Sequence, residues 1–590
     1  MPYYRAPSED MAFVIDELAD IGGTLGGLAS YVEYGVGDEL TSSILDEAGK
    51  LASEVLAPLR ATGDTNPARC EEGKIILSPG YAQAWQQMAA GGWQGISIPV
   101  DEGGQGLPEI YGTAAFEMWS GANMAFGLGP LLTAGAALAI SSHGSDQQKA
   151  AYLEKMNSGQ WSGTMNLTES GAGSDLGVMK TRAVPEGDHY RLYGQKIFIT
   201  WGDHEATENI IHLVLARLPD APAGSGGISL FIVPKFLLDE KGNPGTRNDM
   251  FPVSTEHKLG IHASPTCVMS FGDGEGAIGY LLGEPNQGLR CMFTMMNEAR
   301  LKVGIQGLGI ADAATQRALA YARERVQGGV PIAQHPDVQR MLFTMKSLTE
   351  AMRSLSYTES ITMDLAHHLV DAEQRQLAQF RLDLMIPVIK GWLTEIGFEV
   401  ANLGVQVHGG MGYIEETGAA QYLRDVRIAS IYEGTNGIQA ADLVARKIRR
   451  DGGSTMAVVL SEIESTIEPL LSSDNKTVAS IASAVDRALG SLRASVEITL
   501  QRSTDNIAHA LLGSFDLMMQ CGYVFGGWHL LRSAALSDAK LVAGSDNPFY
   551  RNKMVTADFY ARHVLPRAAA HGEAVHNADA LFLEAGATAL

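Results

Sequence analysis

A change in hydrophobic period within the chain limits the folds that it can adopt. Residues 163–282 contain short, β-branched and partly alternating runs, such as HYRLYGQKIFIT and ISLFIVPK, separated by Gly, Pro, Asp and Asn. Such runs are typical of β-strands. The flanking segments have helical periodicity instead, and Val338, Met341, Met345 and Leu348 fall on one face of a long helix. The sequence therefore predicts a mainly α fold with one inserted β domain.

The same changes of pattern divide the chain into five parts. A glycine-containing turn, RRDGGST, precedes a last helical region of its own. We expect a leader segment at 1–38, an N-terminal helical domain at 39–162, a middle β domain at 163–283, a helical bundle domain at 284–450 and an additional C-terminal helical domain at 451–590.

The composition argues against several classes of function. The chain of 590 residues has 44 Lys and Arg against 67 Asp and Glu, and the resulting net charge of −23 opposes binding to nucleic acid or anionic membranes. The four cysteines, Cys70, Cys267, Cys291 and Cys521, lie far apart and predict neither a disulfide framework nor a zinc site. The adjacent histidines at 367–368 point in different directions on a helix. We therefore expect a soluble enzyme without a bound metal.

Two segments bear on the location of the protein. The N-terminal MPYYRAPSEDMAFVIDELAD is acidic and lacks the apolar core and cleavage site of a signal peptide. Residues 119–142 carry no formal charge and are long enough to cross a bilayer, but small and polar residues dominate them. We expect a buried helix at this position, no membrane span and a cytoplasmic protein.

Familiar nucleotide-binding motifs are not matched. GAGSDLG, at 171–177, spaces its third glycine one residue too far for a dinucleotide-binding loop and leads toward the β region. The chain contains neither GxxxxGK[ST] nor GxSxG, so a P-loop ATPase and a hydrolase with a nucleophile elbow are unsupported.

Four other stretches can carry chemistry, although each also has an ordinary structural interpretation. They are MNLTESGAGSDLG at 165–177, KIFITWGD at 196–203, QVHGGMGY at 406–413 and IYEGTNGIQ at 431–439. In the first stretch, small residues expose backbone N–H groups, and Thr168 and Ser174 add hydroxyl donors. Taken singly, each stretch can also be explained by structure alone: the first as a Gly-rich turn, the second as a strand end, the third as a helix C-cap and the fourth as a surface turn.

Together, and in this order, the four stretches resemble the acyl-CoA dehydrogenase family of flavoproteins, over about residues 40–450. LTESGAGSD matches the first signature of the family, KIFIT its flavin-stacking strand, and QVHGGMGYIEE its second signature. The N-terminal YRAPSEDMAFVIDEL and the extra C-terminal helices resemble the bacterial branch that contains 3-methylmercaptopropionyl-CoA dehydrogenase. The resemblance implies an N-terminal helical domain, a middle β-barrel-like domain, a C-terminal four-helix bundle and the additional C-terminal helical domain.

The resemblance also implies an activity. Members of the family use FAD to remove an α-proton and a β-hydride from a saturated acyl-CoA, and they release the trans-2-enoyl thioester, as in fatty-acid β-oxidation. IYEGTNGIQ matches the segment with the catalytic glutamate, so Glu433 would be the base. A thioester α-proton is weakly acidic, so its base must be close, oriented and desolvated. We expect burial beside Ile431 and Tyr432 to raise the proton affinity of Glu433.

By position, the resemblance assigns further contacts to named residues. The predicted FAD contacts are Met165, Leu167, Thr168, Gly173, Ser174, Phe198, Ile199, Thr200, Arg325, Gln406, Gly409, Gly410, Thr435 and Asn436. The predicted substrate contacts are Ser174, Asn297, Arg300 and Gly434. Gly434 would leave room for the acyl chain, and its backbone or that of Glu433 would polarise the thioester carbonyl.

The chain departs from the family pattern at a few positions. Some relatives place the base one residue before the arginine that is Arg300 here, but that position is Ala299, and Glu298 is offset by one. Gln327-Gly328 replaces the Thr-Phe pair that commonly follows the FAD-binding arginine. Gln421 stands where a basic residue is expected, Val178 stands where a small residue is expected, and Asn166 is unusual.

The resemblance implies partners and leaves alternatives. We expect an acyl-CoA substrate, ranging from 3-methylmercaptopropionyl-CoA to medium- or long-chain thioesters, electron-transfer flavoprotein as the electron acceptor, and a homodimer. One alternative is an acyl-CoA oxidase, with a similar fold and base but with O₂ as acceptor. The other is a DNA-associated relative, against which the net charge of −23 argues.

Overall fold

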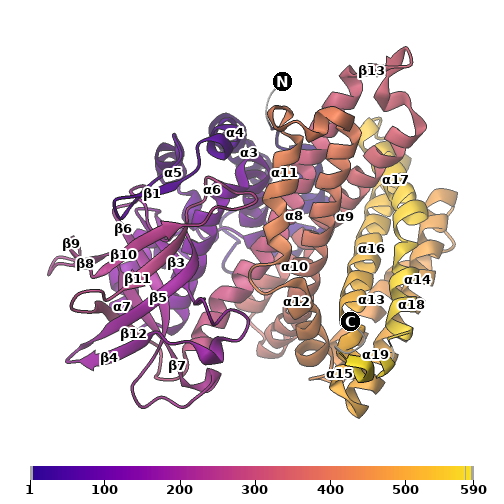
Figure 1. The fold of residues 1–590 in the computed structure, drawn as a ribbon. Helices are drawn as coiled ribbons and strands as arrows, with labels where there is room; N and C mark the ends of the chain where they lie inside the picture. The colour runs from indigo at the N-terminus through magenta and orange to yellow at the C-terminus, as the bar shows by residue number, and fades with distance from the viewer. Residues whose placement is uncertain (1–3, 579, 587–590) are drawn as a thin grey trace. The chain divides into compact units, whose positions relative to one another are not determined.

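The computed structural model describes residues 4–578 and 580–586 (Figure 1). Residues 1–3 of the predicted leader, and residues 579 and 587–590 of the predicted C-terminal domain, lie outside the described residues. The chain forms two compact units. The first unit contains residues 48–107 and 122–302, and the second contains 6–47, 108–121 and the chain from 303 onward.

The first unit is built around a sheet of eight strands. Its strands are β3 (Trp161–Asn166), β4 (Arg182–Glu186), β5 (His189–Thr200), β6 (Asn209–Arg217), β7 (Ile228–Pro234), β10 (Met250–Thr255), β11 (Thr266–Phe271) and β12 (Ala277–Leu282). They are ordered β10-β11-β5-β12-β7-β6-β3, with β4 paired to β5 and β6. The β3–β6 pair is parallel, with Trp161 opposite Asn209, and most other neighbours are antiparallel. The inserted β domain is therefore confirmed.

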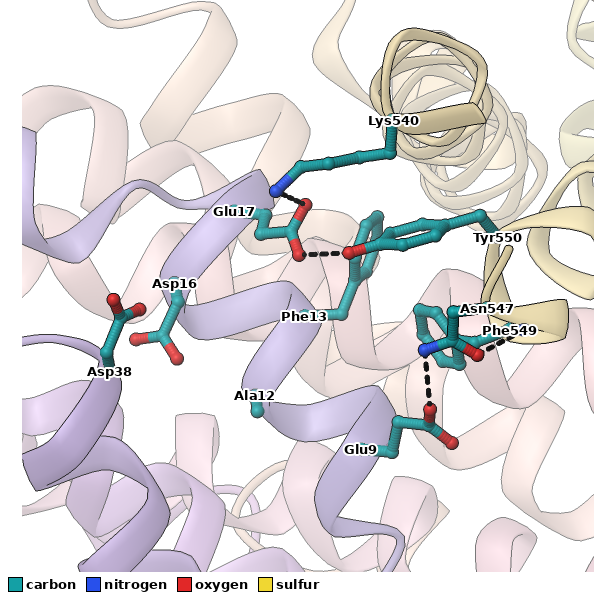
Figure 2. Close-up of a pocket in the computed structure, with 10 residues that line it drawn as sticks. All are labelled: Glu9, Ala12, Phe13, Asp16, Glu17, Asp38, Lys540, Asn547, Phe549 and Tyr550. Carbon is teal, nitrogen blue, oxygen red and sulfur yellow. Dashed lines mark hydrogen bonds and ion pairs between the residues drawn. The ribbon is translucent and has the colours of Figure 1, made fainter. Parts of the chain in front are cut away.

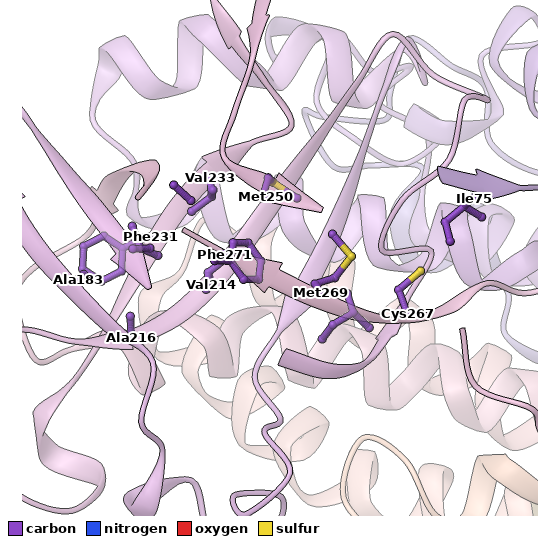
Figure 3. Packing of buried hydrophobic residues seen from close by; sticks show 13 residues of the cluster. Ile75, Ala183, Val214, Ala216, Phe231, Val233, Met250, Cys267, Met269 and Phe271 are labelled. Atoms are coloured by element: carbon purple, nitrogen blue, oxygen red, sulfur yellow. The ribbon is translucent and has the colours of Figure 1, made fainter. Parts of the chain in front are cut away.

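Buried apolar side chains fill the interior of this unit. Figure 3 shows a cluster in which Phe231 and Val233 of β7 pack together with Met250 of β10 and Phe271 of β11. Each of these side chains is at most 1% exposed. Burial of one such side chain contributes about 1.5–3 kcal/mol, so the apolar residues of these strands stabilise the core of the unit.

The first unit also holds a small hairpin that the sequence pattern did not predict. β1 (Arg69–Glu71) and β2 (Lys74–Ile76) pair antiparallel, with Glu71 opposite Lys74. The two turn residues, Glu72 and Gly73, have φ of 49° and 72°, as a tight type I′ hairpin turn requires. Three-residue strands are too short to show a period, although the EG pair is a turn signal.

The remaining elements around the sheet are mostly helical. They are α4 (Ala57–Thr65), α5 (Tyr81–Ala90), α7 (Asp146–Asn157) and the short strands β8 (Phe236–Leu238) and β9 (Pro244–Arg247). Helices α3 (Asp38–Lys50), α6 (Glu109–His143) and α8 (Gly288–Glu324) each contribute residues to both units. Within α6, Asn123 leaves the helical region of φ and ψ, and its side chain donates to the carbonyl of Leu56.

Helix α6 contains the uncharged stretch identified in the sequence. Among the described residues it is the one helix that is long and apolar enough to cross a membrane, and 83% of its most apolar window is buried within the protein. A mostly buried helix of this kind is a core element, and the expectation of a buried helix at 119–142 is confirmed.

The second unit is helical throughout its longer elements. Its helices are α1 (Ser8–Ala12), α2 (Ile21–Leu25), α9 (Pro336–His368), α10 (Ala372–His408), α11 (Ala419–Val426), α12 (Asn436–Asp442), α13 (Ser454–Leu470), α14 (Lys476–Asp505), α15 (Ile507–Leu512), α16 (Ser514–Val542), α17 (Pro548–Phe559), α18 (Arg567–His576) and α19 (Ala580–Ala585). A two-stranded hairpin, β13 (Val326–Gln327) with β14 (Val330–Pro331), follows α8. The mainly α chain with an additional C-terminal helical region is thus confirmed.

Helix α16 joins the additional C-terminal helices to the bundle. It packs against α9 and α10 on one side and against α14, α17 and α18 on the other. At Gly522, an added Cβ would lie 2.1 Å from Cγ of Trp392 on α10. Because no larger residue fits this approach, the glycine allows the two helices to pack closely.

A buried group of charges joins distant parts of the second unit. Arg353 on α9 is 2% exposed and pairs with Glu117 on α6 at 2.5 Å and with Asp312 on α8 at 2.9 Å. Arg353 also pairs with Asp10 of the leader, and Asp10 in turn pairs with Lys553 on α17. Burial opposes the charge of Asp10, but Lys553 and Arg353 outweigh it and hold the pKa of Asp10 below its ordinary value.

This cluster gives a prediction about stability. Replacing Arg353 by Met leaves three buried carboxylates without their shared cation, and we expect a loss of about 3–5 kcal/mol in the free energy of unfolding. The control is Arg562→Met, which removes an i,i+4 pair with Asp558 whose arginine is 59% exposed, and which should cost less than about 1 kcal/mol. Urea unfolding followed by circular dichroism compares the two, and equal losses would contradict a central role for Arg353.

A cavity of about 360 Å³ lies where the leader meets helices α16 and α17 (Figure 2). Its lining includes Asp16, Glu17 and Asp38 together with Lys540 and Tyr550. Glu17 accepts a hydrogen bond from Tyr550 at 2.9 Å and pairs with Lys540 at 3.1 Å. Among the described residues, none of the predicted site residues lines this cavity.

The carboxyl group of Asp16 should make stability depend on pH. Burial, together with Asp38 and Glu17, raises the pKa of Asp16 to about 6 despite a hydrogen bond from Thr41 at 2.6 Å. The folded chain therefore holds this proton more tightly than the unfolded chain, and the stability that this provides is lost as the pH rises through about 6. Asp16→Asn should raise the melting temperature above wild type at pH 8 but not at pH 4. The exposed Asp474→Asn is the control, and an equal effect of Asp16→Asn at both pH values would contradict the assignment.

Candidate active site

The predicted site residues divide between the two units, which we describe in turn. The first unit carries Met165, Leu167, Thr168, Gly173, Ser174, Phe198, Ile199, Thr200, Asn297 and Arg300. The second unit carries Arg325, Gln406, Gly409, Gly410, Glu433, Gly434, Thr435 and Asn436.

In the first unit, the fold brings the two predicted flavin-contacting stretches together. The loop after β3 lies beside the end of β5, because Ile197 N–H donates to the carbonyl of Thr168 at 2.9 Å. The Nζ of Lys196 donates to the carbonyl of Leu167, also at 2.9 Å. Leu167 and Thr168 are therefore fixed next to the strand that carries Phe198 and Thr200.

A buried ion pair holds this arrangement in place. Lys196 is 0% exposed and pairs with Glu169 at 2.9 Å. Glu169 also accepts from the backbone N–H groups of Lys180 and Thr181, at 2.7 and 3.0 Å, and from the Thr181 hydroxyl at 2.6 Å. Burial lowers the pKa of Lys196 to about 8, whereas Lys196 and the Thr181 hydroxyl outweigh burial and lower the pKa of Glu169. The pair ties three segments of the unit to one another.

Phe198 has an unusual backbone conformation. Its φ is 61°, in the left-handed region that a bulky residue rarely adopts, and its ring is 58% exposed. The register with β11 shifts between Ile199 opposite Cys267 and Lys196 opposite Met269, so a β-bulge lies at this point. A bulge redirects a side chain, and here it turns an aromatic ring out of the sheet. An exposed ring at this position fits the predicted contact with a planar cofactor.

The loop at 171–174 has open space beside its backbone, where a group such as FAD could bind. A Cβ added at Gly171 or Gly173 would meet nothing within 4 Å, and neither residue has a positive φ. The packing of the chain itself therefore does not require glycine at these positions. Ser174 is exposed in the same loop. Small residues that leave this space open permit close approach of a ligand to the backbone.

Asn166 and Val178, two residues that depart from the family pattern, have different surroundings. Asn166 is buried in β3, where its Nδ2 donates to Oγ1 of Thr164 at 2.8 Å, and that hydroxyl lies 2.7 Å from Nδ1 of His212. Burial lowers the pKa of His212 to about 3, so this histidine is neutral. Val178 is 55% exposed. None of these residues belongs to the predicted site.

Two predicted CoA contacts lie on α8. Asn297 is half-buried and Arg300 is 4% exposed, so the guanidinium of Arg300 lies largely inside the protein. Ala299 is 1% exposed and cannot act as a base. Its neighbour Glu298 lies 3.9 Å from Lys302, one turn along the helix.

In the second unit, the predicted ADP-binding residues lie at the ends of two helices. Gly409, with φ of 61°, ends α10, and Gln406 and Gly410 beside it are exposed. Tyr321, one turn before Arg325, stacks on His408 with ring centroids 4.4 Å apart. This stacking brings the two helix ends together, so these four predicted residues share one region. A Cβ at Gly410 would meet nothing within 4 Å, which leaves space for a ligand here as well.

The departure at Gln327-Gly328 has a structural reason. Gly328 and Gly329, with φ of 62° and 85°, form the two-residue turn of the β13–β14 hairpin. Ile332 N–H donates to the carbonyl of Arg325 at 2.7 Å, which fixes the arginine at the base of the hairpin. Arg325 itself is exposed.

Glu433 lies on a short irregular segment before α12. Its φ is 56° and that of Gly434 is 84°, so two successive residues have left-handed backbone. For a residue with a side chain this conformation costs about 1–2 kcal/mol and is found mostly at functional sites. Glu433 is half-buried, and the expectation of burial by Ile431 was wrong, since that side chain is 47% exposed. Tyr432 does flank the carboxylate, and burial followed by the charge of Glu433 raises the pKa of Tyr432.

Thr435 and Asn436 begin the next helix. The Thr435 side chain accepts from Ile438 N–H at 3.4 Å and so caps α12. The Asn436 side chain is 3% exposed, and its Nδ2 donates to Thr394 at 2.9 Å and to Glu395 at 2.7 Å. Any contact between Asn436 and FAD would therefore fall to its backbone.

Sequence reasoning missed the residues that support both stretches. Lys196 and Glu169 in the first unit, and Lys390 and Gln439 in the second, are buried polar residues that bond to predicted site segments. The sequence did contain a clue to each lysine. Lys390 is a single charge inside the apolar run IPVIKGW, and Lys196 is a charge inside a predicted strand. A buried charge of this kind requires a partner.

Four protein-family descriptions match the chain in sequence. They are "Acyl-CoA dehydrogenase, N-terminal domain" at residues 39–160, "Acyl-CoA dehydrogenase, middle domain" at 164–273, "Acyl-CoA dehydrogenase, C-terminal domain" at 286–448 and "Acetyl-CoA dehydrogenase C-terminal like" at 459–585.

Individual relatives match almost the whole chain. It is 46% identical to a 3-methylmercaptopropionyl-CoA dehydrogenase from Ruegeria pomeroyi, over 98% of this chain and 99% of that protein. It is 33% identical to a broad-specificity linear acyl-CoA dehydrogenase from Mycobacterium tuberculosis, over 99% of both chains. Its fold is similar to that of an acyl-CoA dehydrogenase from Bacillus anthracis crystallised with FAD, with a TM-score of 0.74 and 21% identity over 96% of this chain and 91% of that one.

The Glu169–Lys196 pair yields a prediction for the first unit. Glu169→Gln leaves the buried Lys196 without its counter-charge, and we expect a loss of about 3–5 kcal/mol in stability together with weaker retention of FAD on dialysis. The control is Glu186→Gln, which removes the pair between Arg191 and a glutamate that is 55% exposed on the same sheet, and which should leave FAD content unchanged. Thermal unfolding and the flavin-to-protein absorbance ratio measure both effects. Unchanged flavin retention in Glu169→Gln would contradict this role for the pair.

Proposed function

This chain belongs to the acyl-CoA dehydrogenase family of FAD-dependent oxidoreductases, and on that premise we propose that Glu433 is the base of its reaction. The carboxylate of Glu433 takes the α-proton of a saturated acyl-CoA thioester, and the product is the trans-2-enoyl-CoA. FAD, when bound, accepts the β-hydride.

The backbone of Glu433 is the observation that carries this proposal. A non-glycine residue with φ of 56° is energetically unfavourable, and proteins retain such residues chiefly where function requires them. Gly434, which follows it, has no side chain to obstruct an acyl group. A carboxylate that is half-buried and next to a tyrosine also matches a base that must be partly desolvated.

The residues around the predicted flavin positions support the same proposal. The exposed ring of Phe198 offers a face for stacking, and the open space at Gly171 and Gly173 admits a ligand to the loop backbone. We propose that these residues, with Thr168 and Ser174, contact the flavin, and that Arg325 and Gln406 contact its ADP part. Asn297 and Arg300 would contact CoA.

For the substrate, we propose 3-methylmercaptopropionyl-CoA. The support is the 46% identity to a 3-methylmercaptopropionyl-CoA dehydrogenase, which extends over nearly the full length of both chains. The rival is a linear medium- or long-chain acyl-CoA, in line with the relative of broad specificity. A panel of thioesters of increasing length, with and without the sulfur atom, distinguishes the two.

Further proposals concern the electron acceptor, the location, the oligomeric state and the domain boundaries of the enzyme. We propose that electrons pass to electron-transfer flavoprotein, that the protein is a cytoplasmic homodimer, and that its domains are divided at 39, 163, 284 and 451. The dimer would be formed because the additional C-terminal helices cover a face that shorter relatives use to form tetramers. Light scattering of the purified protein measures the number of subunits.

Anaerobic mixing with acyl-CoA tests the proposed reaction. The wild-type flavin absorbance near its visible maximum should bleach with at least one thioester, whereas Glu433→Gln should slow bleaching by about 10³-fold or more because the α-proton then has no acceptor. Glu298→Gln is the matched control, since this carboxylate, next to Ala299 in sequence, has no role in the proposal and its loss should leave bleaching intact.

The outcome also separates the alternatives. If Glu433→Gln bleaches as fast as wild type, or if Glu298→Gln is the slow variant, Glu433 is not the base. Formation of hydrogen peroxide at the rate of turnover in air would instead identify an acyl-CoA oxidase.

A further inference from the structure

We propose that Lys390 and Gln439 are positioning residues that hold the backbone of Glu433 and Gly434 in its left-handed conformation. This inference rests on the proposed function, because it concerns how the chain orients the base. Neither side chain was predicted to touch FAD or substrate. They donate hydrogen bonds instead to the backbone carbonyls of Glu433 and Gly434, the two residues with left-handed φ.

The conformation at this segment needs support from elsewhere in the unit. In the left-handed region the Cβ of Glu433 lies too close to its own carbonyl oxygen, so this conformation persists only where surrounding contacts favour it. A relaxed backbone would turn the Glu433 carboxylate to another direction. Supporting contacts should therefore act on the peptide groups on either side of the strained residue.

Lys390 provides the contact that is distant in sequence. It is 0% exposed on α10, and its Nζ donates to the carbonyl of Gly434 and to Oδ1 of Asn436, both at 2.8 Å. A hydrogen bond from an ammonium group is stronger than one from a neutral donor. Because α10 is a core helix of 37 residues, Lys390 fixes the segment to a rigid element.

Gln439 provides the local contact. It is 0% exposed on α12, and its Nε2 donates to the carbonyls of Glu433 at 3.1 Å and Gly434 at 3.4 Å. Both carbonyl oxygens therefore accept from buried donors. A third contact, from the Tyr432 hydroxyl to Gln306, holds the preceding side chain.

The geometry accounts for the choice of residue types. The carbonyls of Glu433 and Gly434 lie within reach of a long lysine on α10 and an amide on α12, and these two side chains supply their donors. Met in place of Lys390 keeps the volume but removes the donor. Glu in place of Gln439 keeps the shape but sets a carboxylate against two carbonyl oxygens, which is repulsive.

The test compares two buried lysines of the same unit in the holoenzyme. Lys390→Met removes the donor to Gly434, whereas Lys553→Met removes a lysine that is 2% exposed and bonds to Glu350 at 3.0 Å. The first readout is amide hydrogen exchange of the peptide covering residues 431–439. The second is the rate of flavin bleaching in a single turnover, measured beside the dissociation constant for the acyl-CoA.

We expect exchange in this peptide to accelerate at least tenfold more in Lys390→Met than in Lys553→Met, because loss of Lys553 weakens the buried charge cluster of the unit without removing a contact to this segment. Bleaching should slow by about 10²-fold in Lys390→Met, since misplacing a catalytic group by about 1 Å has an effect of this size. The dissociation constant should change by less than about threefold. Gln439→Glu should give the same pattern, and it replaces Lys390→Met if that variant does not fold.

Equal acceleration of exchange in both lysine variants would show a loss of stability alone and would overturn the proposal. So would a bleaching rate in Lys390→Met that matches wild type, or a defect confined to the dissociation constant. If no thioester bleaches the wild-type flavin, the proposed function fails, but hydrogen exchange still reports whether Lys390 holds the segment.

Discussion

The second unit depends on one arginine that three distant carboxylates surround. Arg353 pairs with Asp10, Glu117 and Asp312, which come from the leader, α6 and α8. Lys553 links the same cluster to α17 and so to the additional C-terminal helices. Charges buried in this way stabilise only when all of them are paired, so the leader and the C-terminal region belong to the fold of the unit that carries Glu433. The fully buried Tyr357 adds a hydrogen bond to Glu117 of the cluster at 2.6 Å.

The same principle operates at the smaller scale of the candidate site. In each unit, a buried lysine fixes a segment that carries predicted site residues, Lys196 by the carbonyl of Leu167 and Lys390 by that of Gly434. Each lysine has a hydrogen-bond or ion-pair partner that offsets part of the cost of its burial. Supports of this kind fix the backbone of the segments that carry Thr168 and Glu433. Two of the non-glycine residues with left-handed backbone lie close to these lysines, since Phe198 follows Lys196 on the same strand and the residue after Glu433 accepts a hydrogen bond from Lys390.

Much of this organisation is readable from the sequence. The change of hydrophobic period predicted the β domain, because its main strands, of five to twelve residues, are long enough to show a pattern. The spaced motifs identified the family, since each is short but their order is specific. The hairpin at 69–76 was missed because its strands have three residues each. The pairing of Asp10 with Arg353 spans 343 positions, and no local pattern reports such a contact.

Two errors concern single residues and have simple causes. Ile431 was expected to bury Glu433, but it is 47% exposed, because apolar character alone does not say which way a side chain points from an irregular segment. The left-handed φ of Glu433 was not predicted, since this region is expected of glycine and the neighbouring Gly434 gave no sign that two successive residues adopt it. The contacts of Lys390 and Gln439 with the carbonyls of Glu433 and Gly434 were not predicted either, since Lys390 lies on a helix distant in sequence and the role of Gln439, at the end of the motif, is not visible in its pattern.

Exchange of the substrate α-proton isolates the proton transfer proposed for Glu433 from the redox chemistry. A 3-thia-acyl-CoA has α-protons but carries sulfur at the β-position, so it cannot lose a β-hydride. In D₂O, proton NMR should show the wild-type holoenzyme replacing the α-protons of this thioester by deuterium, while Glu433→Gln leaves them in place over the same time. Equal exchange by the two proteins would contradict the assignment of Glu433 as the base.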